Sequence, residues 1–395
     1  MRKALVLGLA RSGRAAQAAL EARGVEVVGA DRTLGNDTDL GLLEDVDVLV
    51  KSPGVPGEAP LVQAARERGV TVWSEIELAS RLLPNPVVGV TGTNGKTTTT
   101  ELLGVMLGAP TAGNVGTALA ELVGRVREDE WIVCELSSFQ LEDVDEFRPR
   151  IAVLLNLEPD HLDRHGTFEA YRDAKLRVFE RQTADDVAIV PRGFGPVPGA
   201  ARRVEFSRDD ELPAEPLIPG PHNRENAAAA TAAARAAGVG DDRIADALRT
   251  FPGVPHRLEL VAEIDGVRYV NDSKATNTAA ARQALRAFDA PLHLILGGRE
   301  KGERFDEFAQ EVAAANVSIA YLIGEAAGRL GEDLDDAAVP NLLAVTLDRA
   351  VAEAASAAEP GDVVLLSPAC ASYDQFRDFE QRGEEFRRLV ENLER

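Results

Sequence analysis

The stretch Val87-Val88-Gly89-Val90-Thr91-Gly92-Thr93-Asn94-Gly95-Lys96-Thr97-Thr98 decides the fold of the middle of this 395-residue chain. Its first four residues predict a buried strand, its glycines a loop, and its last residues the start of a helix that continues through Leu103. Such a loop turns backbone N–H groups toward phosphate oxygens, and the helix N-terminus adds partial positive charge. The spacing is shorter than the usual G-x-x-x-x-G-K-[ST] motif, because Val90 stands five positions before Gly95. We interpret it as an ATP-binding phosphate loop formed by Gly92, Thr93, Asn94, Gly95, Lys96, Thr97 and Thr98.

Candidate metal ligands follow the next two predicted strands. Glu135 ends the apolar run 131–134, and an acid at the end of a strand beside a phosphate loop can hold Mg²⁺. His161 lies after the run 151–155 and is a second candidate. Lys175 lies in a predicted helix, where a neutral amine could add CO₂ and become a carbamate that binds Mg²⁺. From the residues alone, an ordinary strand terminus, an incidental loop histidine and a solvated lysine stay open as alternatives.

Lysine is rare in the chain. Only six of the 43 basic residues are lysine, so the other 37 are arginine. A lysine kept in such a chain is a candidate for chemistry that a guanidinium cannot do, such as a compact charge on phosphate or a nucleophilic amine. Four of the six lie in motifs that carry candidate chemistry, namely Lys96, Lys175, Lys274 and Lys301.

Composition excludes several classes of protein. The net charge of -22 disfavours nucleic acid as a partner, and a hydrophobic content of 45% is ordinary for globular proteins. No apolar run is long enough for a membrane span, so we expect no membrane association and a cytoplasmic location. Cys134 and Cys370 lie far apart in apolar runs, which favours buried free thiols over a disulfide.

The alternation of strand and helix patterns predicts an α/β protein with three domains. Paired prolines at 84 and 86, and the run Phe251-Pro252-Gly253-Val254-Pro255, mark the breaks. We predict a Rossmann-like domain over 1–85, a central P-loop ATPase-type domain with a parallel sheet over 86–253, and a Rossmann-like domain over 254–395. The third begins with a hairpin, 259–264 and 267–271, turned at Asp265-Gly266.

The first domain carries a partial dinucleotide fingerprint. The run Gly8-Leu9-Ala10-Arg11-Ser12-Gly13 follows a strand and opens a helix, and Asp31 ends the next strand. Taken alone, this pattern favours NAD. Alanine at the second glycine position limits how closely a pyrophosphate can approach, which weighs against that interpretation.

Taken together, these motifs resemble the Mur ligases, the ATP-dependent amino-acid-adding enzymes of peptidoglycan synthesis. The resemblance covers nearly the whole chain, and the phosphate loop and the pair Asp160-His161 are common to the family. Three further runs resemble the D-glutamate-adding members: Glu135-Leu136-Ser137-Ser138-Phe139-Gln140, Asn271-Asp272-Ser273-Lys274-Ala275-Thr276-Asn277 and Ser367-Pro368-Ala369-Cys370-Ala371-Ser372.

The resemblance implies ligation of D-glutamate to UDP-MurNAc-L-Ala through an acyl phosphate, by a monomer with two Mg²⁺ ions and a carbamate on Lys175. It implies the metal ligands Thr97, Glu135, His161 and Lys175, with Lys96 and Lys274 at the reacting groups. It places ATP also on Asn223, Asn226, Arg257 and Asp272, with the third domain closing over the second about a hinge at 254–256. For the UDP substrate it implies Ser12, Asp31, Arg32, Ser52, Asn114 and His161, and for D-glutamate it implies Thr276, Lys301, Ser372 and Phe379.

Two rival interpretations stay open. One is another amino-acid ligase of the same superfamily, adding L-alanine or diaminopimelate or elongating folyl polyglutamate. The other is a non-catalytic nucleotide-binding scaffold, or an NAD-dependent oxidoreductase with a P-loop insert. The second leaves Lys96, Glu135, His161 and Lys175 without a shared task.

Overall fold

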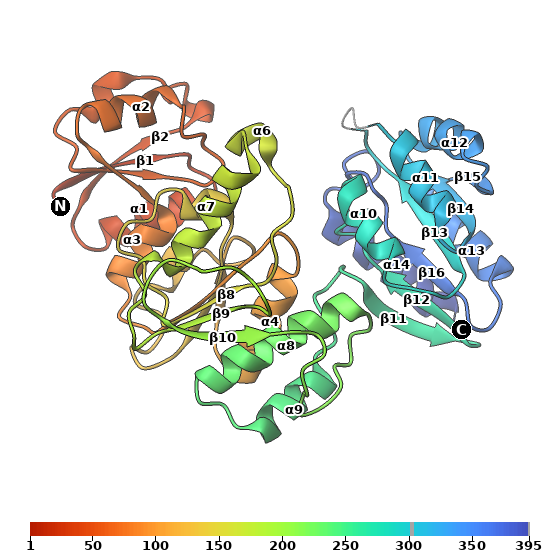
Figure 1. Ribbon diagram of the computed structural model, residues 1–395. Helices are drawn as coiled ribbons and strands as arrows, with labels where there is room; N and C mark the ends of the chain where they lie inside the picture. Colours follow the sequence, from red (N-terminus) through yellow and green to blue (C-terminus); the bar gives the residue numbers. More distant parts are fainter. Residues whose placement is uncertain (301–303, 394–395) are drawn as a thin grey trace. The chain divides into compact units, whose positions relative to one another are not determined.

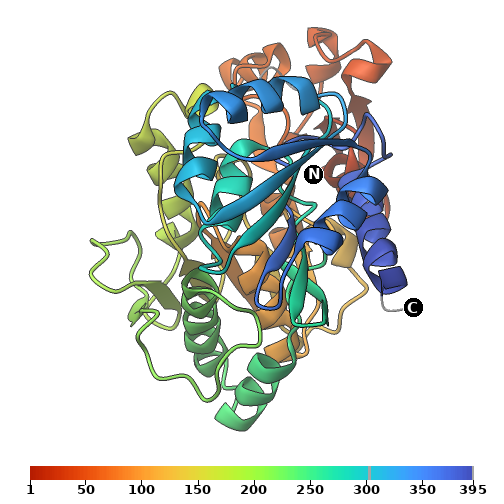
Figure 2. The same ribbon diagram turned by 90° about the vertical axis from the view of Figure 1, so that its right-hand side faces the viewer.

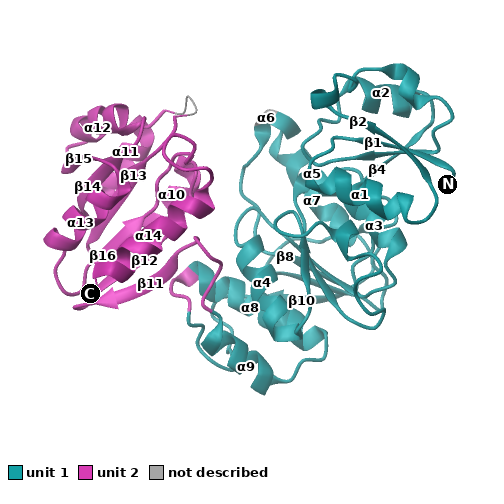
Figure 3. Ribbon diagram, turned by 180° about the vertical axis from the view of Figure 1, so that it is seen from behind, with its two compact units in different colours: residues 1–217, 222–251 teal, residues 218–221, 252–395 magenta. Residues whose placement is uncertain are grey.

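The computed structural model describes residues 1–300 and 304–393, which form an α/β protein with three sheets (Figure 1). The chain divides into two compact units (Figure 3). Unit 1 comprises residues 1–217 and 222–251 and contains two of the sheets, and unit 2 comprises residues 218–221 and 252–395 and contains the third.

The first sheet of unit 1 has the strand order β2-β1-β3-β4, with all strands parallel. Its side chains alternate between two apolar layers because successive residues of a strand point to opposite faces. Leu5 and Leu49 pack with α2, whereas Val6 and Val48 pack with α1 and α3. The elements are β1 Lys3–Leu7, α1 Arg11–Glu21, β2 Glu26–Ala30, η1 Arg32–Leu34, η2 Leu40–Leu43, β3 Val48–Lys51, α2 Pro60–Glu67, β4 Thr71–Ser74 and α3 Glu75–Leu82.

The second sheet of unit 1 has the order β10-β9-β8-β5-β7-β6 and is also parallel throughout. Near-continuous burial along β5, β7 and β8 is typical of parallel strands covered on both faces. The elements are β5 Val87–Thr91, α4 Lys96–Leu107, β6 Thr111–Gly113, η3 Leu119–Leu122, β7 Ile132–Glu135, α5 Ser138–Leu141, β8 Ile151–Leu154, α6 Leu162–His165, α7 Phe168–Glu180, β9 Val187–Pro191, β10 Arg202–Phe206, α8 Pro221–Ala236 and α9 Asp241–Thr250.

The two sheets of unit 1 share one hydrophobic cluster. Ala19 of α1 and Ile76 of α3 belong to the same buried cluster as Ile132 of β7 and Leu154 of β8. Both helices therefore present apolar side chains to the second sheet as well as to the first. The predicted boundary at residue 85 lies inside this unit, and the three-domain division stays a prediction.

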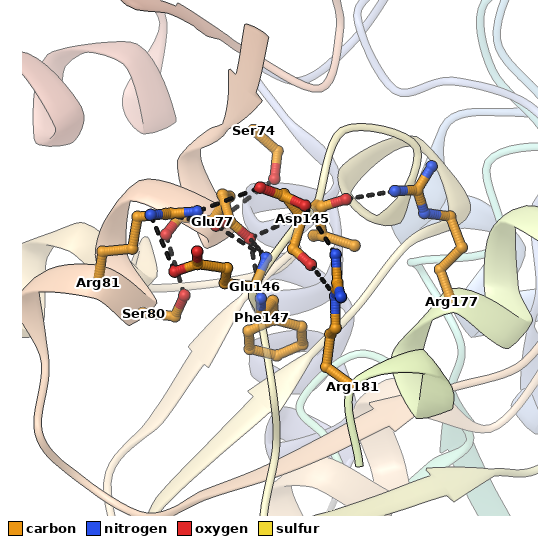
Figure 4. A network of polar contacts seen from close by, with 10 residues as sticks. Ser74, Glu77, Ser80, Arg81, Asp145, Glu146, Phe147, Arg177 and Arg181 are labelled. Atoms are coloured by element: carbon orange, nitrogen blue, oxygen red, sulfur yellow. Dashed lines mark hydrogen bonds and ion pairs between the residues drawn. The ribbon is translucent and has the colours of Figure 1, made fainter. Parts of the chain in front are cut away.

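A buried carboxylate reinforces the same junction (Figure 4). Glu77 of α3 is fully buried, and its oxygens accept hydrogen bonds from the backbone N–H groups of Asp145, Glu146 and Phe147 at 2.8 to 3.1 Å. Arg81 Nε also donates to Glu77 Oε1 at 2.5 Å. Because a buried charge needs this many partners, α3 is fixed to the loop that precedes β8.

The sheet of unit 2 has the order β11-β12-β16-β13-β14-β15, and only the β11–β12 pair is antiparallel. Alternate side chains again separate two layers: Leu294 packs with α10, α11 and α12, whereas Ile295 packs with α13 and α14. The ribbon shows helices on both faces of this sheet (Figure 2). The elements are β11 Glu259–Ile264, β12 Val267–Asn271, α10 Thr278–Leu285, β13 Leu292–Gly297, α11 Asp306–Ala314, β14 Val317–Ile323, α12 Ala327–Asp336, β15 Asn341–Val345, α13 Leu347–Ala357, β16 Val363–Leu366 and α14 Phe379–Leu393.

The structure confirms the α/β class and the predicted hairpin of β11 and β12. Both cysteines are buried and free, although Cys370 lies in the loop after β16 rather than in a strand. Over the described ranges, no helix has the length and apolar character needed to cross a membrane.

Candidate active site

The phosphate loop joins β5 to α4 as the sequence predicts. Gly95 precedes α4 with a φ of 80°, in the left-handed region that favours glycine, and a Cβ there would collide with the side-chain oxygen of Asn226. Asn156, after β8, clamps the loop from the other side: its Oδ1 accepts from Asn94 N at 2.8 Å and its Nδ2 donates to Asn94 O at 3.2 Å. The loop conformation is therefore fixed by side chains from two other elements.

Two lysines converge on this loop. Lys96 Nζ donates to Gly92 O at 2.9 Å and to Thr93 O at 2.8 Å, and Lys175 Nζ donates to the same Gly92 O at 2.7 Å. Lys175 is 2% exposed. Burial, followed by repulsion from Lys96, lowers the pKa of Lys175 to about 6. The amine of Lys175 is therefore largely neutral at pH 7, which is the form that can act as a nucleophile.

Tyr171 supports Lys175 and was not among the predicted site residues. It lies one helical turn before Lys175 on α7, and the lysine amine is 4.8 Å from the centroid of its ring. Its hydroxyl is 3.0 Å from Thr93 Oγ1. The spacing of four residues places both side chains on one helix face, so the sequence contained a signal that could have linked them.

Glu135 lies at the carboxyl end of β7, beside Val90 of β5 in the strand register. Its side chain is buried, and its Oε1 accepts a hydrogen bond from Asn114 Nδ2 at 3.0 Å. Thr97 lies on the first turn of α4 and is also buried, and its side chain carries a hydroxyl oxygen. Carboxylate and hydroxyl oxygens are suitable ligands for Mg²⁺.

The described part of the chain contains no group of three or more His, Cys, Asp or Glu residues positioned to hold a metal ion.

His161 is the least enclosed of the predicted metal ligands. It is exposed, has a φ of 52°, and its Nε2 lies 3.5 Å from Asp160 Oδ2. Its ring centroid is 4.8 Å from that of Phe139 and 6.4 Å from that of Tyr171. His161 and Lys175 are therefore neighbours of the same tyrosine.

The loops of the first sheet adjoin this region within unit 1. The side chain of Arg11, at the start of α1, donates to the carbonyl of Gly116, two residues after Asn114. Arg164 of α6 donates to Pro53 O at 2.8 Å and to Val55 O at 3.2 Å. The predicted loops for the UDP substrate are thus connected to the segments that carry Asn114 and His161.

Two predicted residues for the UDP substrate, Ser52 and Asp31, already have hydrogen-bond partners in the loop after β1. Ser52 Oγ donates to Gly8 O at 2.6 Å. The carboxylate of Asp31 accepts from Leu9 N at 2.6 Å and from Thr33 N at 2.8 Å, and these two backbone hydrogen bonds help lower the pKa of Asp31 to about 2. Arg32 is almost fully exposed, and Ser12 lies on the first turn of α1.

Asn223 and Asn226 are buried on the first turns of α8, and Asn226 touches the phosphate loop at Gly95. Other predicted residues lie in unit 2. Asp272 is buried after β12, where Ser367 Oγ donates to it at 2.7 Å and burial raises its pKa to about 6. Arg257 precedes β11, and its positive charge lowers the pKa of Asp272, which opposes the effect of burial.

The predicted D-glutamate residues follow the carboxyl ends of the strands of unit 2. Thr276 follows β12, Ser372 is buried after β16, and Phe379 begins α14. Lys274, predicted at the reacting groups, also follows β12. Lys301 lies outside the described residues. The structure therefore gathers the described members in the loops at one edge of a parallel sheet, where ligands bind in open α/β sheets.

Comparison with known proteins identifies the family. Residues 90–193 match the Mur ligase middle domain, and residues 256–370 match the Mur ligase, glutamate ligase domain. The chain belongs to the Mur ligase family.

Relatives of this Mur ligase align over almost its whole length. It is 42% identical to the UDP-N-acetylmuramoylalanine--D-glutamate ligase of Acidobacterium capsulatum, with 98% of this chain and 96% of that protein covered. It is 41% identical to the protein of the same name from Pelotomaculum thermopropionicum, with 100% and 98% covered. Among solved structures, the MurF ligase of Thermotoga maritima in complex with ADP is similar in fold, with a TM-score of 0.60, 18% identity, and 91% and 92% of the chains covered.

The central loop of this Mur ligase and its lysines were predicted from the sequence, but the residues that hold them were missed. Tyr171 and Asn156 are such residues, and Arg164, which holds the loop after β3, was missed as well. Asn and Arg are common in loops and on surfaces, so their types alone gave no signal.

Proposed function

We propose that this chain is the ATP-dependent ligase that joins D-glutamate to UDP-N-acetylmuramoyl-L-alanine in the synthesis of peptidoglycan precursors. The observation that carries the proposal is the 41–42% identity, over nearly the full length, to ligases named for this reaction. The NAD-dependent oxidoreductase is not supported, because both family matches are to Mur ligase domains.

The chemistry begins with phosphorylation of a carboxylate. The L-alanyl carboxylate attacks the γ-phosphorus of ATP, the bond to the bridging oxygen of ADP breaks, and an acyl phosphate forms. The amine of D-glutamate then adds to the acyl carbon, loses a proton, and phosphate leaves with the former carboxylate oxygen. Phosphoryl transfer depends mainly on positioning and charge neutralisation, which Lys96 and the loop 92–98 supply.

The side-chain oxygens of the buried residues Thr97 and Glu135 support Mg²⁺ as the metal. The proposed site holds two Mg²⁺ ions. Thr97 and Glu135 are the proposed ligands near the ATP phosphates, and His161 and a carbamate on Lys175 those near the acyl phosphate. When bound, the metal neutralises phosphate charge in the transition state. The neutral amine of Lys175 favours carbamate formation, since protonated lysine does not add to CO₂.

For the sugar nucleotide we propose the loops of the first sheet, with Ser12, Asp31, Arg32 and Ser52 at the UDP end. Asn114 and His161 would then meet the L-alanyl end. The connections of Arg11 to Gly116 and of Arg164 to the loop after Ser52 support one continuous binding path within unit 1.

For the nucleotide and the amino acid we propose the residues predicted from the sequence. We also propose that unit 1 consists of a Rossmann-like domain and a P-loop domain. Hydroxyls and a cation suit the two carboxylates of D-glutamate. The enzyme would act as a cytoplasmic monomer. The ATP residues are Asn223, Asn226, Arg257 and Asp272, and the D-glutamate residues are Thr276, Lys301, Ser372 and Phe379, with Lys274 beside the reacting amine.

The test is phosphate release by the purified protein with ATP, Mg²⁺ and UDP-MurNAc-L-Ala. D-Glutamate, L-glutamate, L-alanine and meso-diaminopimelate are compared as acceptors. Release with D-glutamate alone is expected. Release with any other acceptor and not with D-glutamate would refute the specificity.

A further inference from the structure

Unit 2 contains a fully buried arginine that the proposed reaction does not use. Arg382 of α14 has no exposed surface. Its Nε donates to Ser273 Oγ at 2.9 Å, and Nη2 donates to Ser273 O at 2.8 Å. Both terminal nitrogens lie 3.2 Å from Cys370 O, and Nη1 also reaches Ala371 O at 3.4 Å and Gly297 O at 3.5 Å.

Among the described residues, each hydrogen-bond acceptor of Arg382 is a neutral oxygen, and the charges of Asp374 and Asp272 act on it from beyond ion-pair distance. Within residues 1–300 and 304–393, no carboxylate oxygen lies within 4.0 Å of its guanidinium. Burial lowers its pKa to about 10, so it still carries its charge at pH 7. Burying a charge without an ionic partner is costly, and such a group calls for a reason beyond packing.

The three segments that Arg382 connects are the loops at the carboxyl ends of β12, β13 and β16. Ser273 follows β12, Gly297 ends β13, and Cys370 follows β16. Gly298 allows the close approach, because a Cβ there would collide with Ala371 O and lie 3.1 Å from Arg382 Nη1. A single side chain therefore joins three loops, of which those after β12 and β16 carry the proposed D-glutamate residues Thr276 and Ser372.

The same contacts orient a backbone donor. In a trans peptide the C=O of one residue and the N–H of the next point in opposite directions, and the bond between Ala371 and Ser372 is trans. Ala371 O accepts from Arg299 N at 2.7 Å and faces Arg382 Nη1 at 3.4 Å, so the N–H of Ser372 points away from both. Ser372 is 1% exposed, and in the described part of the chain its N–H has no acceptor. A buried unpaired N–H is rare in proteins and suits a carboxylate ligand.

We propose that Arg382 is a positioning residue for the amino-acid substrate, which fixes the loops after β12, β13 and β16 and directs the N–H of Ser372 toward a substrate carboxylate. Ser273 extends this role, because its hydroxyl accepts from Arg382 and donates to Phe379 O at 2.8 Å. The inference rests on the proposed function in so far as the amino acid is D-glutamate.

The test compares Arg382→Met, Arg382→Lys and Ser273→Ala with the wild type. Arg388→Met is the matched control, because Arg388 is an exposed arginine on the same helix that pairs with Glu385. Phosphate release is measured while D-glutamate, ATP and UDP-MurNAc-L-Ala are varied in turn, and the melting temperature of each variant is recorded.

For Arg382→Met, KM for D-glutamate should rise by at least about tenfold, because the loss of one charge-assisted contact has about this effect. The KM values for ATP and UDP-MurNAc-L-Ala should stay within about twofold of the wild-type values. Arg382→Lys and Ser273→Ala should also raise KM for D-glutamate and not the other two KM values, but by less. If Arg382→Met does not fold, these two variants test the role of Arg382. The control should match the wild type.

An unchanged KM for D-glutamate in the folded variants, or a loss confined to kcat, would overturn the role of Arg382. If the wild type used a different amino acid, the proposed function would fail instead. The same variants measured with that acceptor would then test Arg382 separately.

Discussion

The low pKa of Lys175 predicts how its carbamate depends on pH. An amine with a pKa of about 6 is about 90% neutral at pH 7, whereas a lysine with the ordinary value of 10.5 is only about 0.03% neutral. The fraction able to add CO₂ is therefore about 3,000 times larger than for an exposed lysine. As pH falls through 6, the amine gains a proton and the carbamate should be lost.

Carbon-13 NMR of the protein in ¹³C-bicarbonate with Mg²⁺ measures this directly. We expect one carbamate signal that is present at pH 8, declines with a midpoint near pH 6, and is absent in Lys175→Ala. The variant should also lose most ligase turnover and regain part of it with a short-chain carboxylate. A signal that persists in Lys175→Ala, or that appears only above pH 9, would refute the reasoning.

Three further predictions concern unit 1. Lys96→Arg should lower kcat/KM by more than about tenfold in the phosphate-release assay, because a planar guanidinium does not fit where Lys96 Nζ meets two loop carbonyls; wild-type rates would contradict this. Burial raises the pKa of Glu75 to about 7, so the folded protein keeps a proton that the unfolded chain releases above pH 4.5, and stability falls as pH rises from 4.5 through 7. The unfolding free energy of the wild type should therefore fall between pH 5 and pH 8, and Glu75→Gln should make this fall smaller by about 2 to 3 kcal/mol. If urea titrations gave the same fall for the wild type and the variant, Glu75 would titrate normally. Glu77→Gln should destabilise unit 1 by about 3 kcal/mol in urea unfolding, because an amide cannot replace both carboxylate oxygens, whereas Glu146→Gln at the exposed end of the same network should change it by less than about 0.5 kcal/mol.

The strands with continuous or alternating apolar residues were predictable from the sequence. The pair β11 and β12 has the predicted bounds, and β5 extends the predicted run by one residue. The strand β9 was not predicted although its residues are apolar and mostly buried, and the strands β6, β10 and β15 were not predicted either. The last three lie at or near the sheet edges, where part-exposed side chains give a weak apolar pattern.

The candidate site was predictable where chemistry demands an unusual residue in an unusual place. Lys96 and Lys175 stood out in a chain that otherwise uses arginine, and both meet at Gly92. Tyr171 and Arg382 could not be singled out in this way. The importance of Arg382 comes from its burial and from the carbonyls around it, which only the folded chain reveals. Tyr171 shares a helix face with Lys175 in the sequence pattern, but its contact with Thr93 appears only in the folded chain.

The hydrophobic cluster shared by α1, α3 and the second sheet bears on how this enzyme can be dissected. A fragment that stopped at residue 85 would expose Ala19 and Ile76 to water and would leave the matching surface of β7 bare on the remaining piece. Both fragments would be prone to aggregate. Separation after Phe251 leaves that cluster whole, so studies of isolated pieces are best begun there.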